Sequence, residues 1–174
     1  IGGYPNPERF EATIGEAVRL ARGRSSHGLR AYGEMVAVLW NRGQYPAAVR
    51  LEQLWHQLMS VVPFTLFCAY QIDVFDASFS PAVMQALLCA HTHLLSSGAR
   101  NDLSTALERG MREVLGGDLS RVPGDARSLS GRGWAELPKT ESTILWLRAN
   151  MPEHASSILE HAKGHYQSLT GGNS

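Results

Sequence analysis

Apolar residues in the first half of the chain alternate between helical stripes and short continuous runs. Residues 6–22 carry an apolar stripe at helical spacing, and an Asn-Pro pair suits the start of this helix. The run 29–33 predicts a short strand, and the apolar positions of 35–40 continue from it into a second helix that ends at Gly43.

The same order then repeats. Tyr45–Met59 has a proline near its start and predicts a helix, and a further helix is expected from Ser80 to about Leu95. Between them, Phe64–Tyr70 is almost continuously apolar, which predicts a strand buried on both faces, as in parallel sheets. The order helix, strand, helix, strand, helix indicates an α/β fold with parallel strands.

Two strands are too few for a stable sheet. We therefore expect further strands upstream of Ile1 or on another chain. The first residue is isoleucine and not methionine, which suits a processed chain or a piece of a longer protein.

The second half of the chain has a different pattern. An amphipathic helix is expected at 102–115, a Gly- and Ser-rich linker at 116–137, and two closing helices at 140–149 and 152–169. The predicted organisation is an α/β domain at 1–98, an amphipathic helix at 99–115, a linker at 116–138 and an α-helical extension at 139–174.

Composition narrows the possible functions. The 174 residues balance 16 Lys and Arg against 16 Asp and Glu, which excludes a generic polyanion binder, and 44% hydrophobic residues argue against wholesale disorder. The two cysteines cannot form a disulfide framework, and no apolar run approaches the length that spans a bilayer. We expect a cytoplasmic protein that binds neither nucleic acid nor membrane directly.

Candidate binding residues follow the two predicted strands, because ligands of open α/β sheets bind at the carboxyl ends of the strands. For Glu34 the sequence supports two roles equally: lining such a pocket, or capping the helix that follows. Cys68 and His91 are candidates that also suit a core position. The predicted ligand-binding set is Tyr32, Glu34, Cys68, Tyr70, Gln71, Asp73 and His91.

The sequence predicts no catalytic residue and no metal site, and it identifies no cofactor. It has no glycine-rich phosphate loop and no nucleophile elbow. Cys89 and His93 lack further ligands that converge with them. His154, His161 and His165 share one stripe of the last predicted helix, but no carboxylate or cysteine stands at a convergent position, so a solvated face is expected there.

Three stretches together resemble the MEDS family, the methanogen/methylotroph DcmR-type sensory domain. They are LRAYGEMVAVLW at 29–40, LEQLWH at 51–56 and FTLFCAY at 64–70, and the resemblance covers about residues 3–97. It implies a RecA/KaiC-like three-layer parallel-sheet fold, of which this chain holds the carboxyl half. It also implies a role in prokaryotic signal transduction or transcription regulation, through sensing of a small hydrocarbon-type molecule.

Three functions are therefore considered. The first is a non-enzymatic sensory domain that passes a conformational change to an output module, a kinase or a DNA-binding domain, on the same or another chain. The second is a RecA-like ATPase whose phosphate loop lies upstream. The third is an oligomerisation scaffold built on the closing helices, and a homo-oligomer is expected.

Overall fold

The computed structural model describes residues 4–88, 91–95, 100–116, 119, 122 and 137–171. The chain forms two units, Ile1–Ile72 and Asp73–Ser174, and each is described by itself. Most of the predicted linker and the last three residues lie outside the described residues. The segment boundaries expected from the sequence stay predictions.

The first unit begins with a continuous helical stretch. It comprises α1 (Pro7–Phe10), a π-helical segment η1 (Glu11–Gly15) and α2 (Glu16–Arg24). The side chain of Asn6 accepts a hydrogen bond from the backbone N–H of Arg9 at 2.8 Å, which caps the helix start. The predicted first helix is thereby confirmed, and it extends two residues beyond the predicted end.

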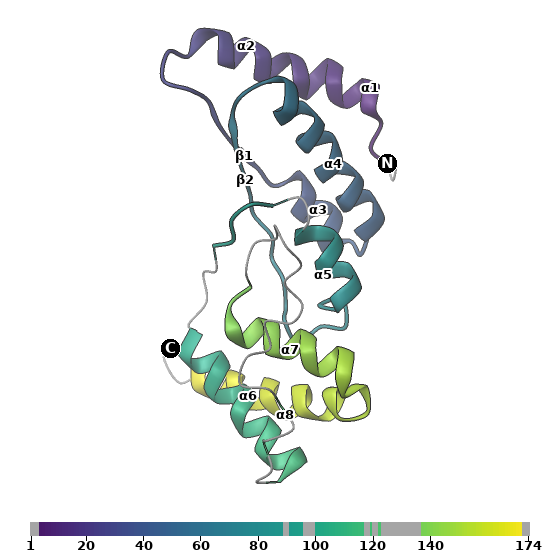
Figure 1. The fold of residues 1–174 in the computed structure, drawn as a ribbon, viewed down its shortest axis with the longest axis vertical. Helices are drawn as coiled ribbons and strands as arrows, with labels where there is room; N and C mark the ends of the chain where they lie inside the picture. The colour runs from purple at the N-terminus through teal and green to yellow at the C-terminus, as the bar shows by residue number, and fades with distance from the viewer. Residues whose placement is uncertain are drawn as a thin grey trace. The chain divides into compact units, whose positions relative to one another are not determined.

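A parallel strand pair and its two connecting helices follow (Figure 1). β1 and β2 are hydrogen-bonded in parallel, with Arg30 opposite Thr65 and Gly33 opposite Cys68. The predicted order and the parallel pairing are confirmed, while a RecA/KaiC-like arrangement stays a prediction. The elements are β1 (Arg30–Gly33), α3 (Met35–Asn41), α4 (Tyr45–Val61) and β2 (Thr65–Cys68).

Local sequence sets the ends of α3 and α4. Gly43 adopts a φ of 68° after α3, and its N–H donates to the carbonyl of Trp40 at 2.8 Å. Glycine adopts this left-handed conformation without the steric cost of a side chain. Val62 is extended after α4, as expected for a residue that precedes a proline.

The prediction that the second strand is buried on both faces is wrong. β2 alternates between exposed and half-buried positions, and Phe67 is 47% exposed. Its ring stacks on the exposed ring of Tyr32 at a centroid distance of 5.9 Å. The strand pair therefore turns Tyr32 and Phe67 to one face and Gly33 and Cys68 to the other, because side chains alternate along a strand.

The core of the first unit is built on α4. Trp55 is buried and meets the ring of Phe10 edge-on at 5.1 Å and that of Phe64 at 6.2 Å. A Cβ at Gly33 would lie 3.9 Å from the ring of Trp55, so this tryptophan covers the carboxyl end of β1. Aromatic and leucine side chains of α4 thus hold the first helical stretch and the strand pair together.

The second unit consists of helices in the part of the chain that the structure describes. They are α5 (Pro81–Leu88), α6 (Arg100–Leu115), α7 (Lys139–Asn150) and α8 (Pro152–Thr170). α6, α7 and α8 confirm the predicted helices. The prediction that the helix from residue 80 continues to about Leu95 is wrong, because residues 91–95 are not helical. The N–H of His91 donates to the carbonyl of Leu88 and so satisfies a group of the last turn. None of the described helices is long and apolar enough to cross a membrane.

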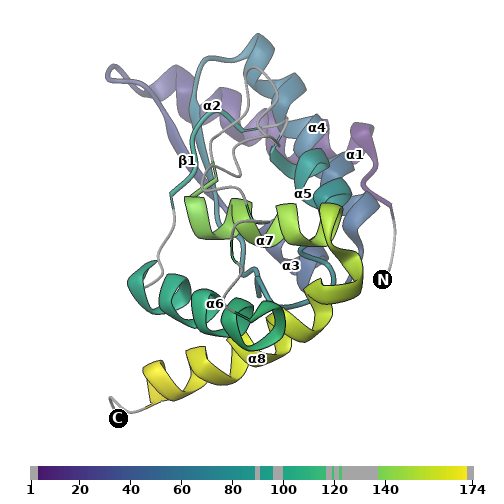
Figure 2. The same ribbon diagram turned by 60° about the horizontal axis from the view of Figure 1, so that its bottom comes forward.

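α6 and α8 pack closely where they meet (Figure 2). Gly110 on α6 is buried against α8, and a Cβ at this position would lie 2.6 Å from the carbonyl oxygen of Ile158 and 2.9 Å from the nitrogen of Ala162. Ile158 and Ala162 are themselves fully buried. The absence of a side chain at Gly110 therefore sets how closely the two helices approach.

We expect Gly110→Ala to destabilise the protein, because the new methyl group meets the α8 backbone, which cannot move aside cheaply. Overpacking of this kind costs about 1–3 kcal/mol, which outweighs the gain of up to about 1 kcal/mol in helix propensity. Gly164→Ala on α8 is the matched control, since a Cβ there meets nothing within 4 Å. Urea unfolding followed by circular dichroism should show a loss for the first variant and a gain for the second. Equal gains would contradict the close packing.

Candidate functional site

The carboxyl ends of β1 and β2 lie at the same edge of the strand pair. Glu34 follows β1 in the N-cap position of α3, but its side chain does not cap that helix. One of its carboxylate oxygens instead accepts a hydrogen bond from the Tyr32 hydroxyl at 2.8 Å. This hydrogen bond raises the pKa of Tyr32 above its ordinary value. The two predicted residues are therefore brought together on the exposed face of the pair.

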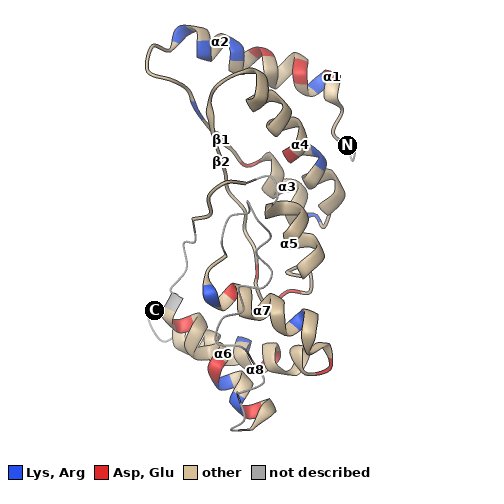
Figure 3. Cartoon of the chain, in the orientation of Figure 1, with Lys and Arg blue, Asp and Glu red and all other residues tan. Residues whose placement is uncertain are grey.

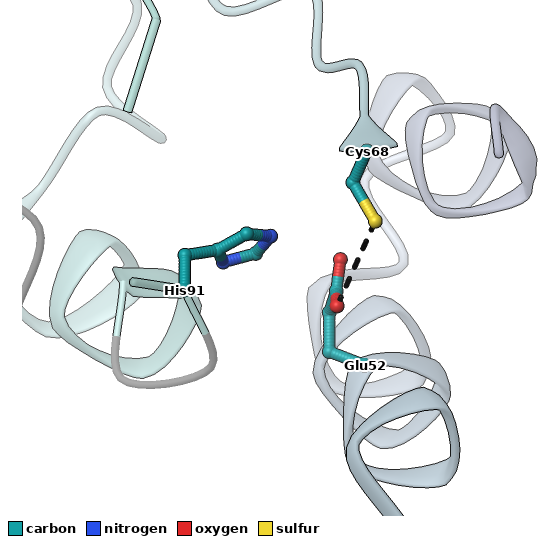
Figure 4. Close-up of side chains that lie close together, drawn as sticks. All are labelled: Glu52, Cys68 and His91. Carbon is teal, nitrogen blue, oxygen red and sulfur yellow. Dashed lines mark hydrogen bonds between the residues drawn. The ribbon is translucent and has the colours of Figure 1, made fainter. Parts of the chain in front are cut away.

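A second group of polar side chains lies on the opposite face, where the Cys68 side chain points toward Glu52 of α4 (Figure 4). Glu52, in the middle of α4, is only 3% exposed. The Tyr70 hydroxyl donates to its Oε1 atom, and the Cys68 thiol donates to its Oε2 atom over 4.0 Å. We call Glu52, Cys68 and Tyr70 the Glu52 cluster. A carboxyl group at this depth needs such partners, because an unpartnered one would lose its hydration without compensation.

Aromatic rings fix Tyr70 in this position. Its ring meets that of Trp40 edge-on at 5.7 Å, and Trp40 is buried at the end of α3. Tyr45, at the start of α4, meets Trp40 from a second direction at 4.9 Å. The polar Glu52 cluster is thus bordered by a buried aromatic ring, which is the mixed character typical of small-molecule sites.

Burial governs the ionisation of the Glu52 cluster. It raises the pKa of the Cys68 thiol to about 12, with a further contribution from the charge of Glu52. Burial and the same carboxylate also raise the pKa of Tyr70. Cys68 is therefore a thiol at neutral pH and not the thiolate that a nucleophilic cysteine requires.

The remaining predicted site residues lie elsewhere. Gln71 is exposed, one position after Tyr70. Asp73 and His91 belong to the second unit. There, Asp73 accepts the N–H of Phe75 at 2.9 Å and pairs with Lys163 at 3.3 Å, and the Nδ1 atom of His91 is hydrogen-bonded to the carbonyl of Leu87 at 2.9 Å. A single pocket lined by all seven predicted residues stays a prediction.

Sequence reasoning missed Glu52, although its position carried a signal. Glu52 stands four residues after Ala48 and three before Trp55, which places it on the apolar stripe of its helix. A carboxylate on a stripe that faces the core is rare unless it is paired. Its partners Cys68 and Tyr70 could not be identified in advance, because they stand at and just after the end of β2, 16 and 18 residues further along the chain.

Charge is distributed unevenly over the helices (Figure 3). α2 carries Glu16 beside Arg19, Arg22 and Arg24, so its charge is mainly positive, and α6 carries both signs. β2 and α5 carry no charged residue. The Glu52 cluster is therefore bordered by an uncharged strand. Of the cysteine and histidine pair considered for a metal, Cys89 lies outside the described residues.

Comparison with known proteins identifies one family. Residues 1–92 match the family described as MEDS, the methanogen/methylotroph, DcmR sensory domain. No curated protein and no solved structure matches the chain. The match contains β1, β2 and the whole Glu52 cluster, and it confirms the resemblance seen in the sequence.

We expect Cys68 to react slowly with iodoacetamide at neutral pH and to ionise only near pH 12. In a Cys89→Ser background, the rate of alkylation against pH measures this pKa. Glu52→Gln should lower the pKa of Cys68 by removing the neighbouring charge, while burial keeps it above the ordinary value of 9.0. Glu34→Gln is the control, since Glu34 is bound to Tyr32 on the other face.

The raised pKa of Cys68 also predicts how the stability of the folded protein depends on pH. The folded-state value of about 12 exceeds the ordinary value of 9.0. The contribution of Cys68 to stability is therefore complete below pH 9 and is lost as the pH rises toward 12. A thiol that ionises near its ordinary pKa in the folded protein would contradict this account of the Glu52 cluster.

Proposed function

Because the chain belongs to the MEDS family of sensory domains, we propose that it senses a small, mainly apolar molecule at the Glu52 cluster. The ligand would bind at the carboxyl edge of β1 and β2, on the face that packs against α4. This location is the one that open parallel sheets use for ligands. No catalytic step is part of the proposal.

The buried position of Glu52 is the observation that carries the proposal. Burial of the Glu52 carboxyl group, which is 3% exposed, lowers the free energy of unfolding. An apolar residue at this position would hold α4 in place without that loss. The cost is understandable if the carboxyl group serves recognition. A few convergent polar groups in apolar surroundings are what orients a small ligand in its site.

Recognition would use exchange of hydrogen bonds. Tyr70 and Cys68 each donate to one oxygen of Glu52. A ligand with an O–H or N–H group would compete with these donors, and its apolar part would contact the ring of Trp40. Binding energy would then favour the conformation in which Tyr70 has left Glu52.

The position of Tyr70 in the chain suggests how the change is passed on. Tyr70 stands two residues after the end of β2 and two residues before Ile72, the last residue of the first unit. A displacement of Tyr70 therefore acts on the segment that joins the sensory unit to the second unit. In this proposal, the conformational change acts on the output module and on the self-association that the sequence leads us to expect.

We expect n-butanol to raise the melting temperature more than n-pentane, because only the alcohol offers a donor to Glu52. Tyr70→Phe removes the competing hydroxyl, so it should strengthen butanol binding and weaken the accompanying change in tryptophan fluorescence. Tyr45→Phe is the matched control, since Tyr45 contacts the same Trp40 ring. Glu52→Leu should abolish the preference for the alcohol over the alkane.

Native mass spectrometry of the protein as purified gives an independent measurement. A native mass above the denatured mass by one small organic molecule, lost in Glu52→Leu, supports the proposal. A native mass equal to the denatured mass, together with a melting temperature that neither n-butanol nor n-pentane changes, would contradict it. A nucleotide as the bound species would also contradict it and would favour the ATPase alternative.

A further inference from the structure

The outer edge of β1 is open in the part of the chain that the structure describes. β1 pairs with β2 on one side, and no described segment pairs with it on the other. The carbonyl groups of Leu29 and Gly33 each accept a backbone N–H from the β2 side of the sheet, at 3.0 and 3.4 Å. Because peptide groups alternate in direction along a strand, the backbone N–H and C=O groups of Arg30 and Tyr32 point away from β2. Such an edge is a template for a further strand.

The exposed side chains along β1 run from a cation to an anion. Arg30 is exposed, Tyr32 is 61% exposed, and Glu34 follows the strand directly. The hydrogen bond from the Tyr32 hydroxyl keeps the Glu34 side chain on the face that Arg30 and Tyr32 share. Neither Arg30 nor Glu34 forms an ion pair with another described residue. Two opposite charges thus stand two residues before and two residues after Tyr32, and each can take a partner.

We propose that β1 pairs with β1 of a second copy of this chain, antiparallel and centred on Tyr32. The two-fold symmetry of such a pair places Arg30 of each copy opposite Glu34 of the other, so that two ion pairs form. A register centred on Arg30 would place two cations opposite each other, which is unfavourable. The occupant of the edge follows from this complementarity, because the order of charges along β1 matches its own reverse.

Aromatic rings support the same pairing. Tyr32 and Phe67 stack at 5.9 Å on the exposed face of the strand pair, and Phe67 is 47% exposed. Residues directly opposite in an antiparallel pair have their side chains on the same face. The Tyr32 rings of the two copies would therefore meet between the two Phe67 rings, and apolar surface would leave water. The sheet would grow from two strands to four, in the order β2–β1–β1–β2, which is a more stable size.

The other edge of the sheet lacks this complementarity. β2 carries no charged residue, so no charge fixes the register of a strand that might pair with it. The charges on β1 therefore distinguish the two edges and assign the second copy to β1.

The expected dimer is weak. Each copy contributes one strand of four residues, so the buried area falls below the roughly 1,200 Å² of standard stable complexes. The equilibrium between monomer and dimer should therefore shift with protein concentration. The inference does not rest on the proposed ligand site, because Arg30, Tyr32 and Glu34 are not members of the Glu52 cluster.

The test is sedimentation velocity of the full chain over a range of concentrations. The wild type should show a monomer–dimer equilibrium that weakens at high salt, because salt screens exposed ion pairs. Arg30→Glu and Glu34→Arg each place like charges opposite each other at two points. Each variant alone should therefore dimerise roughly tenfold or more weakly than the wild type. An equimolar mixture of the two variants should recover the dimer, since every opposed pair then has opposite charges.

Glu16→Arg on α2 is the matched control, because Glu16 is exposed and the change in net charge equals that of Glu34→Arg. This variant should dimerise like the wild type. Circular dichroism establishes that each variant is folded, and Arg30→Gln, which should also weaken the dimer, replaces a variant that does not fold.

Three outcomes would overturn the inference. The first is a wild type that stays monomeric at every concentration. The second is a dimer that Arg30→Glu and Glu34→Arg leave unchanged, which would assign self-association to another surface, such as the closing helices. The third is a mixture of these two variants that dimerises no better than either variant alone.

Discussion

The parallel pairing of β1 and β2 is the constraint on which the sensory unit depends. Parallel strands cannot be joined by a tight turn, so the chain between Gly33 and Thr65 must cross over, and it does so as α3 and α4. The crossover brings the middle of α4 against one face of the pair. It also places the ends of both strands at one edge. Glu52, in the middle of α4, therefore meets Cys68 and Tyr70, which stand at and just after the end of β2.

The Glu52 cluster shows how a fold can hold a buried carboxyl group at the site proposed for ligand recognition. Burial that raises the pKa of Cys68 to about 12 suppresses thiolate chemistry there. The same burial strengthens the hydrogen bond from Tyr70 to Glu52, because competing water is excluded. A site of this kind suits a sensor, in which a small change of partners must alter a conformational equilibrium, better than it suits an enzyme that needs an ionised nucleophile.

The second unit depends on a different contact. Its helices are held where Gly110 allows α6 to approach the backbone of α8. This approach carries Glu113 to the histidines of α8. The stripe of histidines alone suggested a solvated face, because the sequence around it offered no convergent carboxylate. The carboxylate that pairs with His161 and His165 belongs to Glu113, which stands 48 and 52 positions earlier in the chain.

The sequence by itself determined the elements, because helix caps, prolines and apolar periodicity act within a few residues. Asn6, Gly43 and the proline after Val62 set ends that the structure confirms. The motifs of 29–70 also determined the family. Only the tertiary structure decided that Phe67 is exposed, that residues 91–95 are not helical, and which partners Glu52 and Glu113 have. The reason is physical: burial and convergence depend on segments far apart in the chain, and no local pattern records which of them meet.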